Sequence, residues 1–363
     1  MKTTVFPSRV EDITPELLTG LLAEQRPGVK IRGFDIIEIK QFGEGIVSTA
    51  DRVVMNLEYA PGCQCDLPDR VVIKTMLMFP HAPDVMYLNE VRFYQKIRSS
   101  LDIETPQSYG SAFDEQTGQF GVILEDLRVR GARFPNATIP ISLSVITYLV
   151  KTLASLHAQF WMSPRLLTDL NWLSTPCSGG MSQVFKLKGF EYLERRMAKD
   201  EFKVELISSL RTTIKALWSK LWKVQQLLEQ EPTTLLHGDP HIGNTYVLPD
   251  GKAGLLDWQL MIRGCWAHDL TYLLITGLDT EVRRKHEREF IELYLAELKQ
   301  NGVTSPPDFK SAWEMYRRAV IWGLVIGWLI TPPINYGQQI TAANIERLVT
   351  AAQDLETLKA IGH

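Results

Sequence analysis

The stretch from residue 235 to 260, LLHGDPHIGNTYVLPDGKAGLLDWQL, constrains this chain more than any other. Asp239 lies among the turn formers Gly238, Pro240 and Gly243, which predicts a loop. The β-like runs TYVL and AGLLDW are joined by the turn-forming residues 249–252, which predicts a hairpin. Such a hairpin returns Asp257 to the neighbourhood of Asn244. The sequence therefore predicts two carboxylates and an amide close together, and these oxygen ligands suit Mg²⁺ on the phosphates of a nucleotide.

The motif HGDPHIGN, followed by LLDW, resembles the catalytic loop and metal-binding aspartate of the aminoglycoside phosphotransferase and choline kinase superfamily, relatives of protein kinases. In protein kinases the Asp of an Asp-x-x-x-x-Asn loop accepts the hydroxyl proton, while the Asn and a later Asp hold Mg²⁺. The resemblance implies these roles for Asp239, Asn244 and Asp257, respectively. Asp257 is followed by Trp-Gln instead of Phe-Gly. A capped loop and an ordinary hairpin aspartate are the alternative interpretation.

The N-terminal part of the chain predicts one short helix, over 14–25, and antiparallel strands. The strand-like runs cover 31–41, 51–59 and 70–78, and their links are too short for a crossover helix. Gly43, Gly45 and Ser48 lie at the tip of the first hairpin. We expect their backbone N–H groups to cover phosphates, the alternative being a plain hairpin turn.

Lys74 interrupts an apolar strand, where a lysine is costly unless it meets an anion. The following helix carries Glu90 on its apolar stripe, so the two side chains are expected to form an ion pair. Kinases use such a pair to hold the α- and β-phosphates. The segment YLNEVRFY around Glu90 resembles the corresponding helix of the ecdysteroid-kinase-like branch. The alternative is an edge-strand lysine and a partly exposed glutamate.

Residues 119–127, QFGVILEDL, predict a buried strand that resembles the hinge between the lobes of a kinase. The resemblance implies that backbone groups near Glu125 and Leu127 meet adenine. We expect a nucleotide-binding lobe over residues 1–126 and a helical lobe over 127–363 that holds the catalytic loop and the acceptor site. The fold class is therefore α+β, a protein-kinase-like two-lobe fold with a β-rich N-terminal lobe and a mainly helical C-terminal lobe.

Long helical patterns dominate the C-terminal part. They are expected throughout 141–234, most clearly over 141–161 and 201–230, and again over 280–300, 308–331 and 340–360. His157 lies near an apolar helix face and is interpreted as a satisfied core histidine. Asp269, before a helix, is interpreted as a structural N-cap or a clamp on the catalytic loop. His237 is expected to orient that loop, and His241 has no assigned role.

Composition sets broad limits on the class of protein. The 363 residues are 45% apolar and carry a formal net charge of −3, so there is no general attraction to nucleic acid or membrane. The uncharged run 319–330 is too short to span a bilayer, and the N-terminal segment lacks a signal-like apolar region. Four cysteines are irregularly spaced, and Cys63 and Cys65 are interpreted as free thiols rather than a zinc site. A soluble cytoplasmic protein is expected.

These features predict an ATP- and Mg²⁺-dependent phosphotransferase that moves the γ-phosphoryl group to a hydroxyl of a small molecule. An Ala-Pro-Glu segment is absent after Asp257, which argues against a protein substrate. One alternative is a nucleotide-binding pseudokinase or regulatory module without turnover. Another keeps the fold but uses GTP or transfers a different group.

The acceptor is expected to be a neutral or weakly charged, partly apolar hydroxyl compound, because a polycation needs several carboxylates in its cleft. Acidic residues at 279–292 alternate with Arg and Lys and are interpreted as a solvated helix face. The last third is rich in large aromatic residues, for which helix-on-helix packing is the alternative role. These are Trp313, Tyr316, Trp322, Trp328 and Tyr336.

Overall fold

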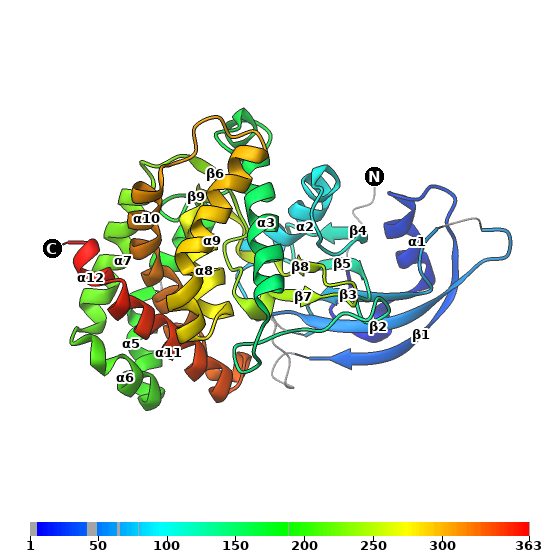
Figure 1. Ribbon diagram of the computed structural model, residues 1–363. Coiled ribbons are helices and arrows are strands. Elements are labelled where there is room, and N and C mark those ends of the chain that lie inside the picture. The colour runs from blue at the N-terminus through cyan, green and yellow to red at the C-terminus, as the bar shows by residue number, and fades with distance from the viewer. Residues whose placement is uncertain (1–5, 42–48, 64–65, 79, 188, 363) are drawn as a thin grey trace. The chain divides into compact units, whose positions relative to one another are not determined.

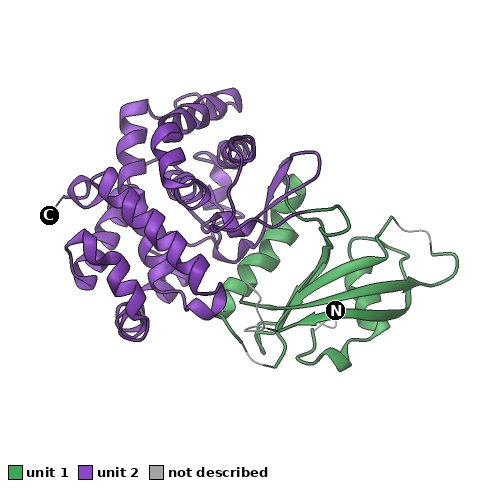
Figure 2. Cartoon of the chain, turned by 60° about the horizontal axis from the view of Figure 1, so that its bottom comes forward, with its two compact units in different colours: residues 1–101, 105–132 green, residues 102–104, 133–363 purple. Residues whose placement is uncertain are grey.

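The structure, a computed structural model shown in Figure 1, describes residues 6–41, 49–63, 66–78, 80–187 and 189–362. The chain forms two compact units, coloured separately in Figure 2. The N-terminal unit comprises residues 1–101 and 105–132, and the C-terminal unit comprises 102–104 and 133–363.

The N-terminal unit contains a five-stranded antiparallel sheet with the order β1-β2-β3-β5-β4. Its strands are β1 (Ile31–Lys40), β2 (Asp51–Tyr59), β3 (Arg70–Thr75), β4 (Ser108–Phe113) and β5 (Phe120–Glu125). The predicted antiparallel strands are thus confirmed, although β3 ends at Thr75 rather than at residue 78.

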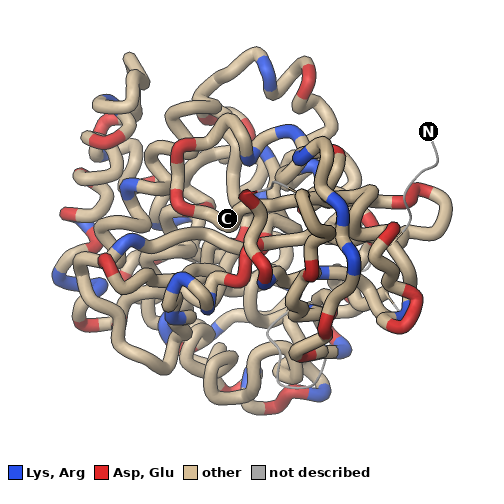
Figure 3. The backbone as a smooth tube through the Cα atoms, turned by 90° about the vertical axis from the view of Figure 1, so that its right-hand side faces the viewer, with Lys and Arg blue, Asp and Glu red and all other residues tan. Residues whose placement is uncertain are grey.

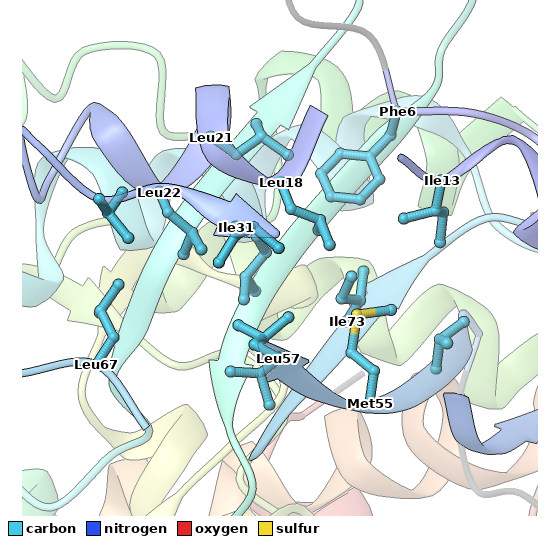
Figure 4. Close-up of a cluster of buried hydrophobic side chains, with 14 of the residues drawn as sticks. Phe6, Ile13, Leu18, Leu21, Leu22, Ile31, Met55, Leu57, Leu67 and Ile73 are labelled. Carbon is cyan, nitrogen blue, oxygen red and sulfur yellow. The ribbon is translucent and has the colours of Figure 1, made fainter. Parts of the chain in front are cut away.

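One face of this sheet carries the hydrophobic core of the unit, drawn in Figure 4. The 3-10 helix Val10–Asp12 and helix α1 (Pro15–Ala23) lie here, and the Thr14 hydroxyl caps α1 by accepting from the Leu17 N–H at 3.2 Å. Leu18 of α1 and Ile73 of β3 belong to the same buried cluster. Since side chains alternate along a strand, Lys74 points to the opposite face.

Helix α2 (Asp84–Lys96) packs on that opposite face and contacts β4 and β5. Tyr87 of α2 stacks on Phe120 of β5 with ring centroids 4.2 Å apart. The neighbouring turn of α2 buries Glu90, and a 3-10 helix, Arg98–Ser100, follows. The helix therefore presents its acidic side chain to the face that carries Lys74.

The C-terminal unit is mainly helical, with two small antiparallel sheets (Figure 1). Its α-helices are α3 (Leu143–Phe160), α4 (Gly179–Leu187), α5 (Gly189–Lys199), α6 (Glu201–Ile207), α7 (Ile214–Leu228), α8 (Ala267–Gly277), α9 (Thr280–Gln300), α10 (Phe309–Trp322), α11 (Gln338–Asp354) and α12 (Thr357–Ala360). One sheet pairs β6 (Thr233–Leu236) with β9 (Ile262–Cys265), and the other pairs β7 (Thr245–Val247) with β8 (Ala253–Leu255).

The prediction of helix throughout 141–234 is wrong, because residues 161–178 form turns and one 3-10 helix, Pro164–Leu167, and β6 begins at Thr233. The predicted single helix over 201–230 is also wrong. Helix α6 ends at Ile207 and is followed by the 3-10 turn Ser208–Leu210 and by Arg211, whose φ is 48°. Thr213 then caps α7 by accepting from the Ala216 N–H at 3.1 Å. Serine and threonine side chains compete with helical hydrogen bonds, so this polar run breaks the helix although the apolar spacing continues.

The predicted helices over 308–331 and 340–360 are also not continuous α-helices. After Trp322 the chain continues as a π-helix, Gly323–Leu329, and α11 and α12 are separated by Glu356, whose φ is 49°. Within the described residues, no helix combines the length and apolar character needed to cross a membrane.

Charged residues of both signs are interspersed along the chain in Figure 3. On α9 the interpretation of a solvated face is partly wrong, because Arg283 and Glu287 are buried. They form an ion pair at 2.6 Å, and Asp354 of α11 also pairs with Arg283. These carboxylates are therefore committed to helix packing.

Candidate active site

The loop after β6 begins with a backbone that only glycine can adopt. Gly238 has a φ of 85°, and a Cβ atom built on it would lie 2.0 Å from the backbone oxygen of Leu260. A side chain at this position would be strained by its conformation and by contact with backbone. This close approach places Asp239 at the end of a tight turn.

Asp269 of α8 holds this turn by hydrogen bonds to its backbone. Its carboxylate accepts the backbone N–H of His237 at 2.7 Å and that of Gly238 at 3.0 Å. The prediction of a loop clamp is confirmed. Burial alone would raise the pKa of Asp269, but the hydrogen bond from His157, the His157 and His237 rings and the Gly238 N–H lower it overall.

His157 continues this network into the core. Its Nε2 lies 3.2 Å from Asp269 Oδ2, and its Nδ1 lies 2.7 Å from the Tyr294 hydroxyl. A carboxylate accepts only, so Nε2 donates and Nδ1 accepts from the tyrosine. The interpretation as a satisfied core histidine is confirmed.

Asn244 is directed at Asp239. Its Nδ2 donates to the backbone oxygen of Asp239 at 2.9 Å and to Asp239 Oδ2 at 3.0 Å. The 3-10 helix Ile242–Asn244 supplies the turn that allows this contact. Because both bonds use the amide nitrogen, Oδ1 of Asn244 is turned away from Asp239.

The predicted hairpin of β7 and β8 brings the second carboxylate to the same place. The Leu256 N–H donates to the Asn244 carbonyl at 2.9 Å, one residue before Asp257. His237 Nε2 donates to the Leu256 carbonyl at 3.0 Å, which ties this strand end to the catalytic turn. Asp257 itself has a φ of 68°, an uncommon backbone conformation for a residue other than glycine.

The two carboxylates influence one another. Burial raises the pKa of Asp239 well above its usual value, the charge of Asp257 raises it further, and the nearby Tyr272 hydroxyl and the Asn244 amide act in the opposite direction. Two like charges in a partly buried site are unfavourable without a cation. The pair therefore has the electrostatic character of a cation site.

The donor set fits Mg²⁺ shared with a nucleotide. Among the described residues no three His, Cys, Asp or Glu side chains form a metal site. Asp257 and the Oδ1 of Asn244 would supply only two protein ligands. Mg²⁺ commonly takes one or two protein oxygens and completes its shell with phosphate oxygens and water.

His241 lies in an aromatic group beside Asp239. Its ring centroid is 5.9 Å from Tyr272 and 5.3 Å from both Trp328 and Tyr336, and its Nε2 is 3.8 Å from Asp239 Oδ2. Burial lowers the pKa of His241 to about 3, so the ring is neutral at neutral pH. This group is uncharged apart from the carboxylate it adjoins.

Tyr272 is the residue of this group that the sequence did not reveal. It lies three residues after Asp269 on α8, and that spacing places both on the side that faces the catalytic turn. The helical spacing was the available signal. By contrast, Tyr316 and Trp322 pack between helices, against Glu287 and His268, respectively. Trp313 stacks on Phe309 of its own helix and lies beneath the Arg288 guanidinium of α9.

The N-terminal unit contains the Lys74–Glu90 ion pair expected from the sequence. Lys74 Nζ lies 2.7 Å from Glu90 Oε2 and 2.9 Å from Oε1, and both residues are buried. A buried lysine and glutamate of this geometry stabilise each other's charge.

The expected hinge residues end β5. Glu125 accepts the Gln107 N–H at 2.8 Å, and the Leu127 carbonyl accepts the N–H groups of Arg130 and Ala132, each at 3.1 Å. Asp126 is held by Arg70 at 2.7 Å. The expected phosphate-covering residues Gly43, Gly45 and Ser48 lie outside the described residues.

Solved structures with a similar fold include small-molecule kinases. LicA, the choline kinase from Streptococcus pneumoniae, aligns in a complex with AMP at a TM-score of 0.50 and 14% identity, covering 95% of this chain and 98% of that one. Spectinomycin phosphotransferase with ADP and spectinomycin aligns at a TM-score of 0.49 and 14% identity, covering 95% of this chain and 99% of that one. Ethanolamine kinase from Plasmodium vivax aligns at a TM-score of 0.47 and 15% identity, covering 88% of this chain and 81% of that one. Comparison with proteins of curated function finds no matching sequence.

The strand-rich unit, the helical unit and the Asp239 loop with its hairpin define a kinase-like two-lobe fold. The model of the ecdysteroid kinase-like family matches residues 43–303, and the chain belongs to this family. The resemblance drawn from HGDPHIGN, LLDW and YLNEVRFY is thereby confirmed.

Proposed function

We propose that the protein transfers the γ-phosphoryl group of ATP, with Mg²⁺, to a hydroxyl group of a small molecule. The observation that carries this proposal is the grouping of Asp239, Asn244 and Asp257 by one turn and one hairpin. A binding-only protein has no need of a proton acceptor held in this way. The turnover-free alternative is therefore less well supported.

Asp239 accepts the proton of the acceptor hydroxyl. Its carboxylate is fixed by the Asn244 amide, and its backbone is fixed through the bonds of His237 and Gly238 to Asp269. A carboxylate positioned in advance avoids the cost of orienting a base during the reaction. Asp257 and Asn244 Oδ1 would hold Mg²⁺, which when bound neutralises charge on the transferred phosphoryl group.

Lys74, held by Glu90, would pair with the α- and β-phosphates. Adenine would meet the backbone after β5, near Glu125 and Leu127. Since the Leu127 carbonyl already accepts two bonds, recognition at this residue would use its N–H. Gly43, Gly45 and Ser48 remain the proposed phosphate-covering residues, and the proposed lobes remain 1–126 and 127–363.

The acceptor is proposed to be neutral or weakly charged and partly apolar. The aromatic group beside the base is uncharged: Trp328 and the neutral ring of His241 are buried, and Tyr336 is partly exposed. A polycationic acceptor would need several carboxylates to offset its charge. A cytoplasmic location and the absence of nucleic-acid or membrane partners stay predictions of the sequence.

A nucleotide-consumption screen tests this proposal. Wild-type protein with Mg-ATP or Mg-GTP would be offered aliphatic alcohols, sterol-like alcohols, choline-like amines and aminoglycosides, with Asp239→Asn as the blank. Consumption above the blank with an apolar alcohol, and a phosphorylated product by mass spectrometry, is the expected result. Efficient use of kanamycin-type aminoglycosides with no turnover of any aliphatic or sterol-like alcohol would contradict the proposed acceptor class. Nucleotide binding without consumption for every acceptor would favour the regulatory alternative.

A further inference from the structure

Two buried hydrogen-bond donors near Asp239 make no hydrogen bond of normal length and angle with the described residues. They are the hydroxyl of Tyr272 and the indole N–H of Trp328. Tyr272 is 2% exposed and Trp328 is 1% exposed, so bulk solvent does not reach either group. Buried polar atoms without partners are rare and unfavourable, and their presence calls for an explanation.

The backbone around Tyr272 is shaped to admit its ring. A Cβ atom on Gly327 would lie 2.2 Å from the Tyr272 hydroxyl oxygen, and one on Gly323 would lie 2.8 Å from its ring. Both glycines belong to the π-helix that carries Trp328. Wide π turns occur often at functional sites. The two glycines therefore allow the π-helix to lie directly against Tyr272.

A buried lysine fixes the end of the same π-helix. Lys203 Nζ donates to the carbonyls of Trp328, Leu329 and Thr331 at 3.1, 3.0 and 2.6 Å. These bonds satisfy carbonyls that a helix end leaves free. The position of Trp328 is thus set by a contact from α6 as well as by its own helix.

The Asp239 carboxylate is a close neighbour of these two donors. Burial raises the pKa of the Tyr272 hydroxyl well above its usual value, and the charge of the neighbouring Asp239 raises it further. The nearby Trp328 lowers the pKa of Tyr272. His241 contacts both aromatic rings and approaches Asp239 Oδ2 at 3.8 Å. Asn244 occupies one side of that carboxylate.

The chemistry of the three groups permits one order of donation. An indole N–H only donates, a carboxylate only accepts, and a tyrosine hydroxyl does both. If Trp328 donates to the Tyr272 oxygen, the tyrosine hydrogen must point elsewhere, and the neighbouring acceptor is Asp239. Catalytic hydrogen bonds are often long without substrates and shorten in the reacting complex.

We propose that Tyr272 is a positioning residue whose hydroxyl, oriented by the indole N–H of Trp328, donates to the Asp239 carboxylate in the reacting complex. Asn244 and Tyr272 then hold the carboxylate from two directions and aim one of its unused lone pairs at the acceptor hydroxyl. This inference rests on the proposed phosphotransfer function. It assigns no contact with the acceptor or the nucleotide to Tyr272.

The comparison of Tyr272→Phe with Tyr316→Phe tests this role. Tyr316 is also buried in the C-terminal unit, but its hydroxyl is paired with Glu287 at 3.0 Å. Tyr272→Phe is expected to lower kcat about 10-fold or more, with the acceptor KM and the Mg-ATP dissociation constant changed less than about twofold. Its midpoint of urea unfolding is expected to stay the same or rise, because an unpaired buried hydroxyl is removed. Tyr316→Phe is expected to show the reverse, a lower midpoint with kcat retained.

Trp328→Phe supplies a second variant that keeps a ring but removes the N–H. It should lower kcat in the same direction, and little further loss should follow in the Tyr272→Phe background. If the wild-type protein is active and Tyr272→Phe keeps the same kcat, this inference is overturned while the proposed function stands. A higher acceptor KM at unchanged kcat, or a fall in kcat accompanied by a lower unfolding midpoint, would overturn it in the same way. A wild-type protein that turns over no acceptor would overturn the proposed function and this inference together.

Discussion

The backbone N–H of His237 donates to the carboxylate of Asp269 at 2.7 Å, so helix α8 holds the main chain of the turn that carries Asp239. The same carboxylate accepts the Gly238 N–H, and His157 Nε2 donates to its Oδ2. The shape of the turn therefore depends on its backbone atoms and on Asp269, a residue outside the turn.

Asp269→Asn should weaken both the fold and the reaction. An amide offers one oxygen where the carboxylate accepts three bonds, so at least one buried N–H loses its partner. The free energy of unfolding should fall by about 2–4 kcal/mol, and kcat should fall with it. Chemical denaturation and steady-state kinetics measure the two effects. Asp308→Asn, at an exposed helix cap where Asn serves equally well, is the matched control and should change neither. Equal behaviour of the two variants would show that the clamp is dispensable.

Lys74→Met and Glu90→Gln should be strongly non-additive. Each single variant leaves one buried charge without its partner, at a cost of about 3–5 kcal/mol, whereas the double variant removes both charges. The double variant should therefore be less destabilised than the sum of the single ones in urea unfolding. Simple additivity would contradict the buried ion pair.

Asp257→Asn should separate stability from activity. In metal-free buffer the substitution removes the repulsion between Asp257 and Asp239, and the free energy of unfolding should rise by about 1 kcal/mol. Turnover should nevertheless collapse, and Mg-ATP should bind more weakly, with only partial recovery at high Mg²⁺ concentration. Calorimetry with Mg-ATP measures the binding. Unchanged Mg-ATP affinity in this variant would remove Asp257 from the proposed metal site.

Lys203 should make stability rise at alkaline pH. Burial lowers its pKa from 10.5 to about 8, so between these values the unfolded chain binds a proton that the folded chain has released. The free energy of unfolding therefore increases as pH rises through this window, by up to about 3 kcal/mol. The measurement is urea unfolding of wild type and Lys203→Met at pH 7 and at intervals up to pH 10.5. Their difference cancels the other titrating groups, and it should grow with pH in favour of the wild type; a constant difference would argue against the lowered pKa.

Local sequence determines much of the proposed catalytic centre. Asp239, Asn244 and Asp257 are brought together by one turn and one short hairpin, so their spacing and the turn residues were sufficient to predict their approach. The Lys74–Glu90 pair followed from strand alternation and a helical stripe, which are equally local patterns.

The acceptor side depends instead on packing between distant segments. Tyr272 meets the π-helix at Gly323 and Gly327, and Lys203 joins that helix end from α6. No periodic pattern records such contacts, because they are set by how whole helices pack. The break at Arg211 was likewise hidden by apolar spacing that continues through it.

The most direct test of the central claim is transfer of labelled γ-phosphoryl from ATP to an acceptor by wild type and Asp239→Asn, with Mg-ATP affinity measured on both. Loss of the base should lower the rate by about 10²–10⁴-fold, while Mg-ATP affinity stays close to that of the wild type. An Asp239→Asn protein that keeps about a third of the wild-type rate on the same acceptor would contradict the account, because base catalysis normally contributes far more than that.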